Sequence, residues 1–299
     1  MESTAAAPAA RCVVCGSADL AERRPAEIER LDQVSFSYTF SPEHNRTFRV
    51  VRCRGCTHQF CSPLPDAIPA QYHEVVDEEY LKHADSRRLA AQAVVARILE
   101  RTGRGRLLDV GCATGDFMES ARAAGFEAEG LELSSWSCDV ARRRGFTVHQ
   151  KTLARFARDS RARFDVVSLI GVIEHLPEPS AEMGHLATLV KPGGMIVVWT
   201  GDADAWLPRL LGRRWWYWQG QHIQYFTHAS LTRLARDAGF VPIVTERYPF
   251  AATHETLSNS LRRYPLHRLI TAALLPVFWI KPVVYLKLSG EMLFMARRP

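Results

Sequence analysis

The chain has 299 residues, of which 47% are hydrophobic, and a net charge of +6. This is enough apolar material for a large core, which excludes a chain that needs a partner to fold. The positive charge is spread among acidic residues, so charge alone does not indicate a nucleic-acid-binding protein.

Residues 1–10 are rich in Ala and Pro and are expected to be disordered. They contain no apolar run of the kind found in secretory signals, so we expect a cytoplasmic protein. In a reducing compartment, paired cysteines are better explained as metal ligands than as disulfides.

Two CxxC pairs lie in residues 11–65: Cys12 with Cys15, and Cys53 with Cys56. Four thiolates suit a tetrahedral zinc ion and leave no open position for catalysis. The 37 residues between the pairs exceed the roughly 15–20 of the common ribbon spacing, which an inserted hairpin would explain. The sequence therefore predicts a zinc-ribbon-like module with structural Zn²⁺. Four reduced cysteines without a metal remain the alternative.

Helix and strand patterns alternate from residue 86 onward, after a linker expected at 66–85. Helices are expected at 86–103, 116–125, 134–145, 180–190 and 227–239, and strands at 106–110, 126–133, 146–150, 164–171, 195–200, 240–248 and 290–299. This alternation predicts an α/β fold with a doubly wound, Rossmann-like sheet over residues 86–299.

Two segments after residue 200 depart from this alternation. Residues 202–228 carry four of the seven tryptophans and are expected to form an aromatic cap that either lines an acceptor pocket or packs on the sheet. Residues 266–287 are apolar but are interrupted by Pro276, Lys281 and Pro282, which argues against a membrane span. With nearby basic residues, this segment is expected either to lie on the inner membrane surface or to form a helix pair over the core or a dimer face.

Gly111 and Gly115 frame a tight turn directly after the strand that Asp109 ends. The spacing matches neither the GxGxxG nor the P-loop pattern. Because an acid at this position would repel a pyrophosphate, a cationic or amine-bearing ligand fits better.

Glu132 ends the next strand, 23 positions after Asp109. A carboxylate there can accept both hydroxyls of a ribose. The pocket is therefore predicted to bind an adenosine-like nucleoside without a diphosphate.

Four stretches in this order, LLDVGCATGDF, EGLELS, FDVVSLIGVIEHLPEP and LVKPGGMIVV, give residues 86–240 a specific resemblance to class I S-adenosylmethionine-dependent methyltransferases. The resemblance implies S-adenosylmethionine as co-substrate. It also implies a set of cofactor-binding residues: Asp109, Gly111, Ala113, Gly115, Glu132, Leu133, Thr152, Leu153, Leu169 and Gly171. Many members carry an Asp beside the adenine after the third strand, but the stretch VHQKTL has none. In this chain, backbone groups are therefore expected to contact the adenine.

A zinc ribbon before such a domain is similar to the arrangement in bacterial enzymes that methylate sugars, polyketides or other small metabolites. The stretch GRRWWYWQGQHIQYFTHASLTRLARDAGF strengthens this resemblance. It implies a small-molecule or lipid-linked acceptor in biosynthesis.

Methyl transfer from a sulfonium needs alignment of the acceptor and a base for its proton. His175 follows the fourth strand at the ligand-binding edge of the sheet, and His222 lies in the aromatic cap. Both are candidate catalytic bases, ahead of Glu174 and Tyr225. The alternative is that His175 caps a turn and His222 packs between cap and sheet.

Two other functions remain open from the sequence. An RNA or DNA methyltransferase would use the zinc ribbon as a nucleic-acid reader, and its binding would be sensitive to salt. A non-catalytic regulator would bind S-adenosylmethionine without turnover.

Overall fold

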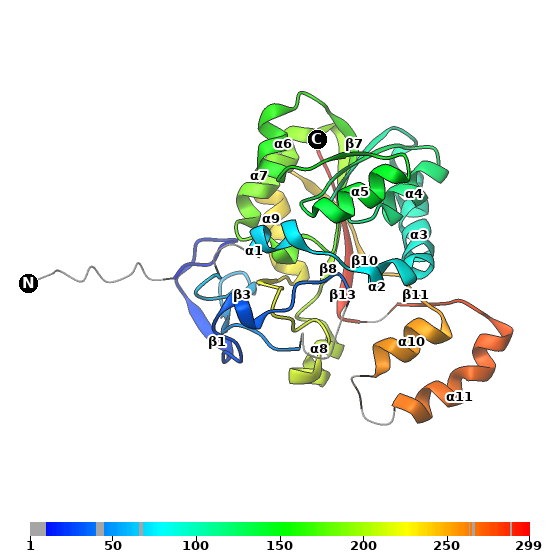
Figure 1. The fold of residues 1–299 in the computed structure, drawn as a ribbon. Coiled ribbons are helices and arrows are strands. Elements are labelled where there is room, and N and C mark those ends of the chain that lie inside the picture. The colour runs from blue at the N-terminus through cyan, green and yellow to red at the C-terminus, as the bar shows by residue number, and fades with distance from the viewer. Residues whose placement is uncertain (1–9, 40–44, 66–67, 263, 265–266, 288) are drawn as a thin grey trace, which may run out of the picture.

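The computed structural model describes residues 10–39, 45–65, 68–262, 264, 267–287 and 289–299. The expected disordered segment, 1–10, therefore lies outside the described residues apart from Ala10. Within them, a large α/β body carries a smaller antiparallel sheet on one side and a pair of helices on another (Figure 1).

The body is built on a seven-stranded sheet, which confirms the expected doubly wound fold. In spatial order its strands are β10 (Val241–Arg247), β13 (Glu291–Arg297), β8 (Val190–Gly201), β7 (Phe164–Ile170), β4 (Arg106–Val110), β5 (Glu127–Leu131) and β6 (Thr147–His149). The strands from β8 to β6 pair in parallel, whereas β13 is antiparallel to both of its neighbours. The parallel strands bring the ends of β4, β5 and β7 to one edge.

Helices cover both faces of this sheet (Figure 1). The apolar side chains of α3 (Ala84–Thr102) and α4 (Asp116–Ala123) pack on one face, and those of α6 (Leu153–Asp159), α7 (Pro179–Leu189) and α9 (His228–Asp237) pack on the other. Helix α5 (Ser135–Arg143) packs beside β6 in a smaller cluster. Burial on both faces explains why the central strands are almost wholly apolar.

Helix α6 was not predicted. Its sequence, LARFARD, is short and highly charged, and only Leu153 and Phe156 are buried. The Thr152 side chain caps it by accepting a hydrogen bond of 3.2 Å from the Arg155 backbone N–H. A seven-residue helix fixed by one cap and two buried side chains gives little periodic signal.

The Cys-containing segment shares its sheet with the aromatic cap. The sheet consists of β1 (Leu20–Arg24), β2 (Val50–Cys53), β3 (Gln59–Cys61) and, as its fourth strand, β9 (Gln224–Tyr225) from the cap. The Cys61 backbone N–H donates to the Ile223 carbonyl over 2.9 Å, and His58 Nε2 lies 2.9 Å from Gln224 Oε1. The expected ribbon module and cap therefore form one packed unit.

The expected linker is helical in its described part. It holds α1 (Ile68–Gln71), the 3-10 helix η3 (Tyr72–Glu74) and α2 (Glu78–Lys82). Ile68 is fully buried, and the Ser134 hydroxyl donates to the Val75 carbonyl over 2.8 Å. Ile68 packs in the hydrophobic cluster of the Cys-containing segment and the aromatic cap, whereas the Ser134 hydrogen bond ties Val75 to the body.

The remaining elements lie around the edges of the body. They are η1 (Leu31–Gln33), η4 (Ile173–His175), α8 (Trp206–Leu211), η5 (Gly212–Arg214), β11 (Phe250–Ala252), α10 (His254–Leu261), α11 (His267–Ile280) and β12 (Val284–Leu286). Helices α10 and α11 project from the body as a pair (Figure 1). None of the helices in the described residues combines the length and apolar character that a transmembrane span requires.

Replacing Phe294 tests how far the body depends on β13. Phe294 is fully buried on this strand, which lies between β8 and β10. Phe294→Ala is expected to lower the free energy of unfolding by about 3–5 kcal/mol, because it removes buried contacts and leaves a cavity. Urea unfolding followed by circular dichroism measures this. Trp279→Ala, at a side chain that is 81% exposed, is the control and should change stability by no more than about 0.5 kcal/mol.

Candidate functional site

The turn between β4 and α4, residues 111–115, has the backbone shape that its glycines predict. Gly111 has a φ of +69°, and a Cβ there would lie 2.5 Å from Val172 Cγ2. Ala113 also has a positive φ, +45°. The Gly111 N–H donates to the Leu131 carbonyl over 2.8 Å, which fixes the turn beside the end of β5. Only glycine fits at position 111 without moving Val172.

Glu132 is nearly fully buried at the end of β5 and holds this turn. Its Oε2 accepts a hydrogen bond of 2.8 Å from the Ala113 N–H. Its Oε1 accepts from the N–H groups of Leu133 and Ser134, over 2.6 and 2.9 Å, and from the Tyr38 hydroxyl over 3.2 Å. Burial raises the pKa of Glu132, while these hydrogen bonds oppose the shift.

Asp109 is buried at the end of β4, where its Oδ1 accepts a hydrogen bond of 2.7 Å from the Ser168 hydroxyl. Burial raises the pKa of Asp109 to about 7, with the Glu132 charge adding to the shift and the Ser168 hydrogen bond opposing it. A carboxyl group that changes charge near neutral pH therefore lies beside the turn.

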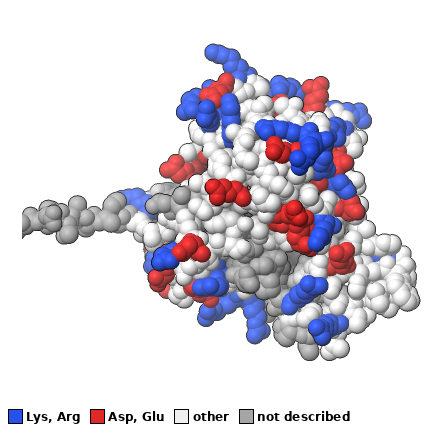
Figure 2. Space-filling view, in the orientation of Figure 1, with Lys and Arg blue, Asp and Glu red and all other residues white. Residues whose placement is uncertain are grey.

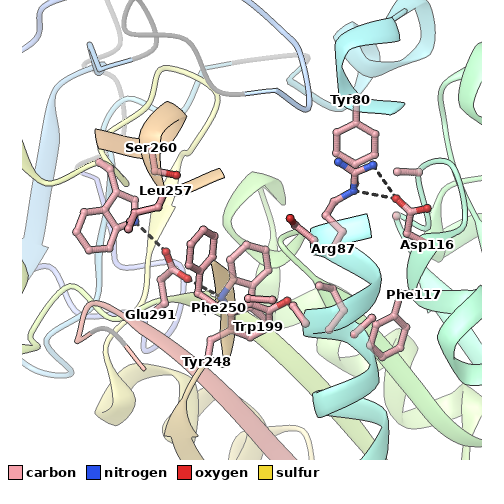
Figure 3. Close-up of a pocket in the computed structure, with 18 of the residues that line it drawn as sticks. Tyr80, Arg87, Asp116, Phe117, Trp199, Tyr248, Phe250, Leu257, Ser260 and Glu291 are labelled. Carbon is pink, nitrogen blue, oxygen red and sulfur yellow. Dashed lines mark hydrogen bonds and ion pairs between the residues drawn. The ribbon is translucent and has the colours of Figure 1, made fainter. Parts of the chain in front are cut away.

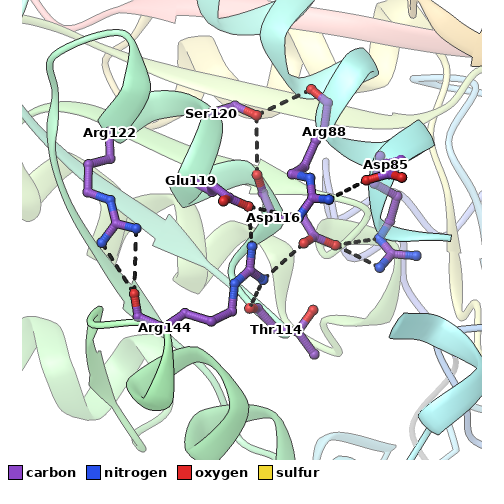
Figure 4. A network of polar contacts seen from close by, with 9 residues as sticks. Asp85, Arg88, Thr114, Asp116, Glu119, Ser120, Arg122 and Arg144 are labelled. Atoms are coloured by element: carbon purple, nitrogen blue, oxygen red, sulfur yellow. Dashed lines mark hydrogen bonds and ion pairs between the residues drawn. The ribbon is translucent and has the colours of Figure 1, made fainter. Parts of the chain in front are cut away.

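A network of ion pairs braces the turn from its outer side (Figure 4). Asp116, the first residue of α4, accepts two hydrogen bonds. One, of 2.8 Å, comes from Arg87 Nε on α3, and the other, of 3.0 Å, comes from Arg144 Nη1 at the end of α5. Arg144 also donates to the Thr114 carbonyl and to Glu119. Three helices are thus tied to the turn.

Two cavities meet at the turn. The first, of about 420 Å³, includes Glu132 and is called the Glu132 cavity. The second, of about 390 Å³, includes Leu257 of α10 and is called the Leu257 cavity. They share Gly111, Ala113 and Trp199 among their walls, so a ligand in one can reach a ligand in the other.

The cavities bring together most of the cofactor-binding residues expected from the sequence. The Glu132 cavity is lined by Gly111, Ala113, Glu132, Leu133, Thr152, Leu153 and Gly171. Asp109 lines the Leu257 cavity. Gly115, which precedes α4, and Leu169, which lies in the core, line neither cavity. Cofactor contacts stay predictions for all ten residues, including the eight that line a cavity.

The two predicted bases, His175 and His222, lie against each other in the wall of the Glu132 cavity, with ring centroids 4.8 Å apart. His175 Nδ1 lies 2.8 Å from the Gln221 carbonyl, and His222 Nδ1 lies 2.8 Å from the Tyr217 carbonyl. A carbonyl only accepts hydrogen bonds, so both rings carry their proton on Nδ1 and have Nε2 as the basic nitrogen. Burial lowers the pKa of His175 to about 4, which keeps its ring neutral at pH 7.

Glu174 completes this group. Burial raises its pKa to about 7, although hydrogen bonds from Tyr217 (2.6 Å) and Thr200 (3.1 Å) oppose the shift. One ligand atom each from Glu174, His175 and His222 lies within 4.8 Å of the others. This set can hold a cation or a shared proton. Tyr225, the last candidate, is fully buried, donates to the Gln219 carbonyl over 3.2 Å and lines neither cavity.

Three tyrosines in these walls were not predicted from the sequence. Tyr38 donates to Glu132, the Tyr72 hydroxyl lies 3.1 Å from His175 Nδ1, and Tyr80 lines both cavities. All three precede residue 86 and were assigned to the ribbon and linker. The only signal for them in the sequence was the presence of aromatic residues in segments expected to be the ribbon and a linker.

The Leu257 cavity has a mostly aromatic and aliphatic lining. Figure 3 shows Trp199, Tyr248 and Phe250 grouped on one side, with Leu257 of α10 nearby. Glu291 receives hydrogen bonds from the indole N–H groups of Trp199 (3.2 Å) and Trp216 (2.8 Å). The cavity therefore suits an apolar or aromatic ligand with few polar groups.

The sulfur atoms of Cys12, Cys15, Cys53 and Cys56, called the Cys cluster, lie within 4.8 Å of one another. The Cys12–Cys56 and Cys15–Cys53 sulfur distances are both 3.5 Å, and all four thiols are free. A tetrahedral Zn²⁺ with sulfur ligands at about 2.3 Å requires sulfurs roughly 3.8 Å apart. The arrangement fits that ion.

Comparison with known proteins decides the family. Residues 79–245 match a family described as a methyltransferase domain, and this span is more than half of the chain. The chain belongs to the S-adenosylmethionine-dependent methyltransferases. The Cys cluster and helices α10 and α11 lie outside the matched span.

Curated relatives of this methyltransferase are identical to it at about a third of the aligned positions, which cover about half of the chain. The ubiquinone biosynthesis O-methyltransferase of Ralstonia nicotianae is 33% identical over 178 residues, which cover 52% of this chain and 74% of the relative. The protein of the same name from Aromatoleum aromaticum is 32% identical over 147 residues, which cover 45% of this chain and 63% of the relative. The chain thus spans under two thirds of the second relative.

A solved structure supports the fold. A SAM-dependent methyltransferase from Archaeoglobus fulgidus superposes with a TM-score of 0.53 at 19% identity, covering 74% of this chain and all of the other. At this identity the likeness concerns the fold alone.

Metal analysis tests the Cys cluster. We expect about one zinc per chain, because four thiolates form a closed tetrahedral site. Cys53→Ser should remove the zinc and increase hydrogen exchange in β9, which pairs with β3. Cys61→Ser is the matched control, because Cys61 is buried on β3 but outside the cluster. A purified protein without zinc, or equal zinc loss in both variants, would contradict the assignment.

Proposed function

We propose that this methyltransferase transfers a methyl group from S-adenosylmethionine to a hydroxyl group of an apolar aromatic precursor in biosynthesis, of the ubiquinone type. The main support for this proposal is that the aromatic Leu257 cavity joins the Glu132 cavity at the glycine turn. The names of the curated relatives support oxygen as the acceptor atom and ubiquinone biosynthesis as the nearest chemistry.

We assign the Glu132 cavity to the co-substrate. The Glu132 carboxylate would exchange its hydrogen bond from Tyr38 for the ribose hydroxyls. Thr152 and Leu153 would flank the adenine, with backbone groups supplying the polar contact. Asp109 lines the Leu257 cavity beside the shared turn, so it would face the positively charged methionine end where the co-substrate extends across that turn.

We assign proton removal to the histidine pair. The acceptor oxygen attacks the methyl carbon, the carbon–sulfur bond breaks with its electron pair passing to sulfur, and the hydroxyl proton passes to Nε2 of His222 or His175. The hydrogen bonds from each Nδ1 to a backbone carbonyl orient the rings for this role. Glu174 would support the charge that develops on the pair.

We assign a structural role to zinc at the Cys cluster, since four thiolates leave no coordination position open. In Figure 2, Lys and Arg are interspersed with Asp and Glu over the visible face, which does not favour nucleic-acid binding there. Measuring methyl transfer distinguishes this enzyme from a non-catalytic regulator, which would bind S-adenosylmethionine without turnover.

The pH dependence of cofactor affinity tests Asp109. Below its pKa of about 7 the carboxyl is neutral, and above it the negative charge attracts the sulfonium or ammonium group. S-adenosylmethionine should therefore bind about fivefold to tenfold more tightly near pH 7.5 than near pH 6. Calorimetric titration measures this, with NAD and ATP as ligands that should not bind. Asp109→Asn should bind weakly and equally at both values, whereas a wild-type affinity independent of pH would contradict the role.

Turnover of His222 variants tests both the base and the proposed reaction. The wild type should methylate a short-chain ubiquinone precursor with a free ring hydroxyl and release S-adenosylhomocysteine. His222→Asn can keep the hydrogen bond to the Tyr217 carbonyl while removing Nε2, so kcat should fall by about 100-fold or more with unchanged cofactor affinity. His175→Asn is the parallel variant. If neither change lowers kcat, both rings are packing residues, and cofactor binding without any turnover would indicate a regulator.

A further inference from the structure

The helix pair α10 and α11 leaves an unusually large apolar surface uncovered. Of the fourteen residues of α11, only Thr271 and Phe278 are buried. Phe278 packs edge-on against His254 of α10, with ring centroids 5.8 Å apart. The pair projects from the body in Figure 1, so no other described element covers its outer side.

The exposed residues of this surface are large and apolar. Trp279 is 81% exposed, Ile280 80% and Leu269 67%. Ile270, Leu275, Val277 and Tyr285 are also exposed. Monomeric proteins rarely present so many large apolar side chains on one short segment unless it meets a partner or a membrane.

The charge of the segment is one-sided. Residues 256–290 contain five Lys and Arg residues and no Asp or Glu, and Glu255 in the first turn of α10 is the one acid of the two helices. Arg268 begins the exposed stretch, and Lys281 and Lys287 follow it, all three exposed. In Figure 2 the lobe at the place of α10 and α11 is mainly white. This is the composition of a helix that lies in the interface of an anionic membrane.

We infer that α11 and the strand after it dock on the surface of an anionic lipid bilayer. Leu269, Trp279 and Ile280 would enter the boundary between headgroups and acyl chains, while Arg268, Lys281 and Lys287 would contact the headgroups. Trp and Tyr favour this depth, which suits Trp279 and Tyr285. Helix α11 has 14 residues and an internal proline, too short to cross the roughly 30 Å hydrocarbon core.

A second copy of the chain fits this surface less well. A two-fold contact places the same patch of both copies face to face. Arg268, Lys281 and Lys287 would then approach their counterparts, and residues 256–290 offer no acid to pair with them. Like charges brought together in this way oppose association, whereas anionic headgroups neutralise them.

Docking also gives the Leu257 cavity a route to the bilayer. Leu257, Ser260 and Leu261 of α10 line that cavity together with Tyr264, so α10, which packs against the docked α11, forms one of its walls. An acceptor with a long apolar chain could enter from the membrane while its reactive ring reaches the turn. This step rests on the proposed function, but the docking itself does not.

Vesicle sedimentation tests the docking with the full chain. We expect the protein to sediment with vesicles of phosphatidylcholine containing about one third phosphatidylglycerol, and much less with phosphatidylcholine alone. Arg268→Glu with Lys281→Glu should weaken binding by at least about tenfold. Arg155→Glu with Arg158→Glu is the matched control, since these exposed residues lie on α6 and the change in net charge is the same. It should bind like the wild type.

Trp279→Ser with Ile280→Ser separates insertion from simple charge attraction and should also reduce binding by at least about tenfold. Light scattering on the same samples gives the mass in solution. The inference is overturned if the wild type does not bind the vesicles, or if the α6 control loses as much binding as the Arg268/Lys281 variant. It is also overturned if the wild type is a dimer that binds no vesicles and the Trp279/Ile280 variant is a monomer. Cofactor affinity, measured in the same variants, should stay at the wild-type value. A wild-type protein that does not bind S-adenosylmethionine would contradict the proposed function but not the docking.

Discussion

The candidate site depends on one buried carboxylate. Burying a charge of this kind is costly unless hydrogen bonds replace its water, and Glu132 receives three backbone N–H groups and the Tyr38 hydroxyl. The donors come from the β4–α4 turn, from the end of β5 and from the N-terminal segment. Satisfying this one group therefore fixes the relative positions of three distant parts of the chain and shapes the Glu132 cavity before a ligand arrives.

The Cys cluster acts on the site through a similar chain of contacts. It joins β2 to the loop before β3, and β3 pairs with β9. Just before β9, the Ile223 N–H donates to the Glu174 carbonyl over 2.9 Å. His222 is thereby held beside His175. A structural metal remote from the ligand cavities would thus orient a candidate base, which gives the N-terminal module a function other than nucleic-acid reading.

The sequence predicted the features that local rules decide. The alternation of apolar strands and helices indicated the central sheet, and the steric demand at Gly111 indicated the turn. Glu132 was predicted because its position follows from strand spacing. Two other features join residues that are far apart in the chain: the pairing of β9 with β3, and the position of Tyr38 in the cavity wall. Neither produces a periodic pattern in the local sequence, so neither could be predicted. The approach of His175 to His222 was missed for the same reason, although each was predicted singly.

The segments outside the matched methyltransferase span converge on its two cavities. Tyr38 reaches Glu132 from the N-terminal side, and α10 lines the Leu257 cavity from the C-terminal side. The turn, Asp109 and Glu132 belong to the matched span, which agrees with their proposed role in binding a shared co-substrate. Fold alone does not set the acceptor. Because α10 borders the Leu257 cavity and not the Glu132 cavity, the proposed function assigns the choice of acceptor to this added helix, and the inferred docking assigns the place where the acceptor is met to α11.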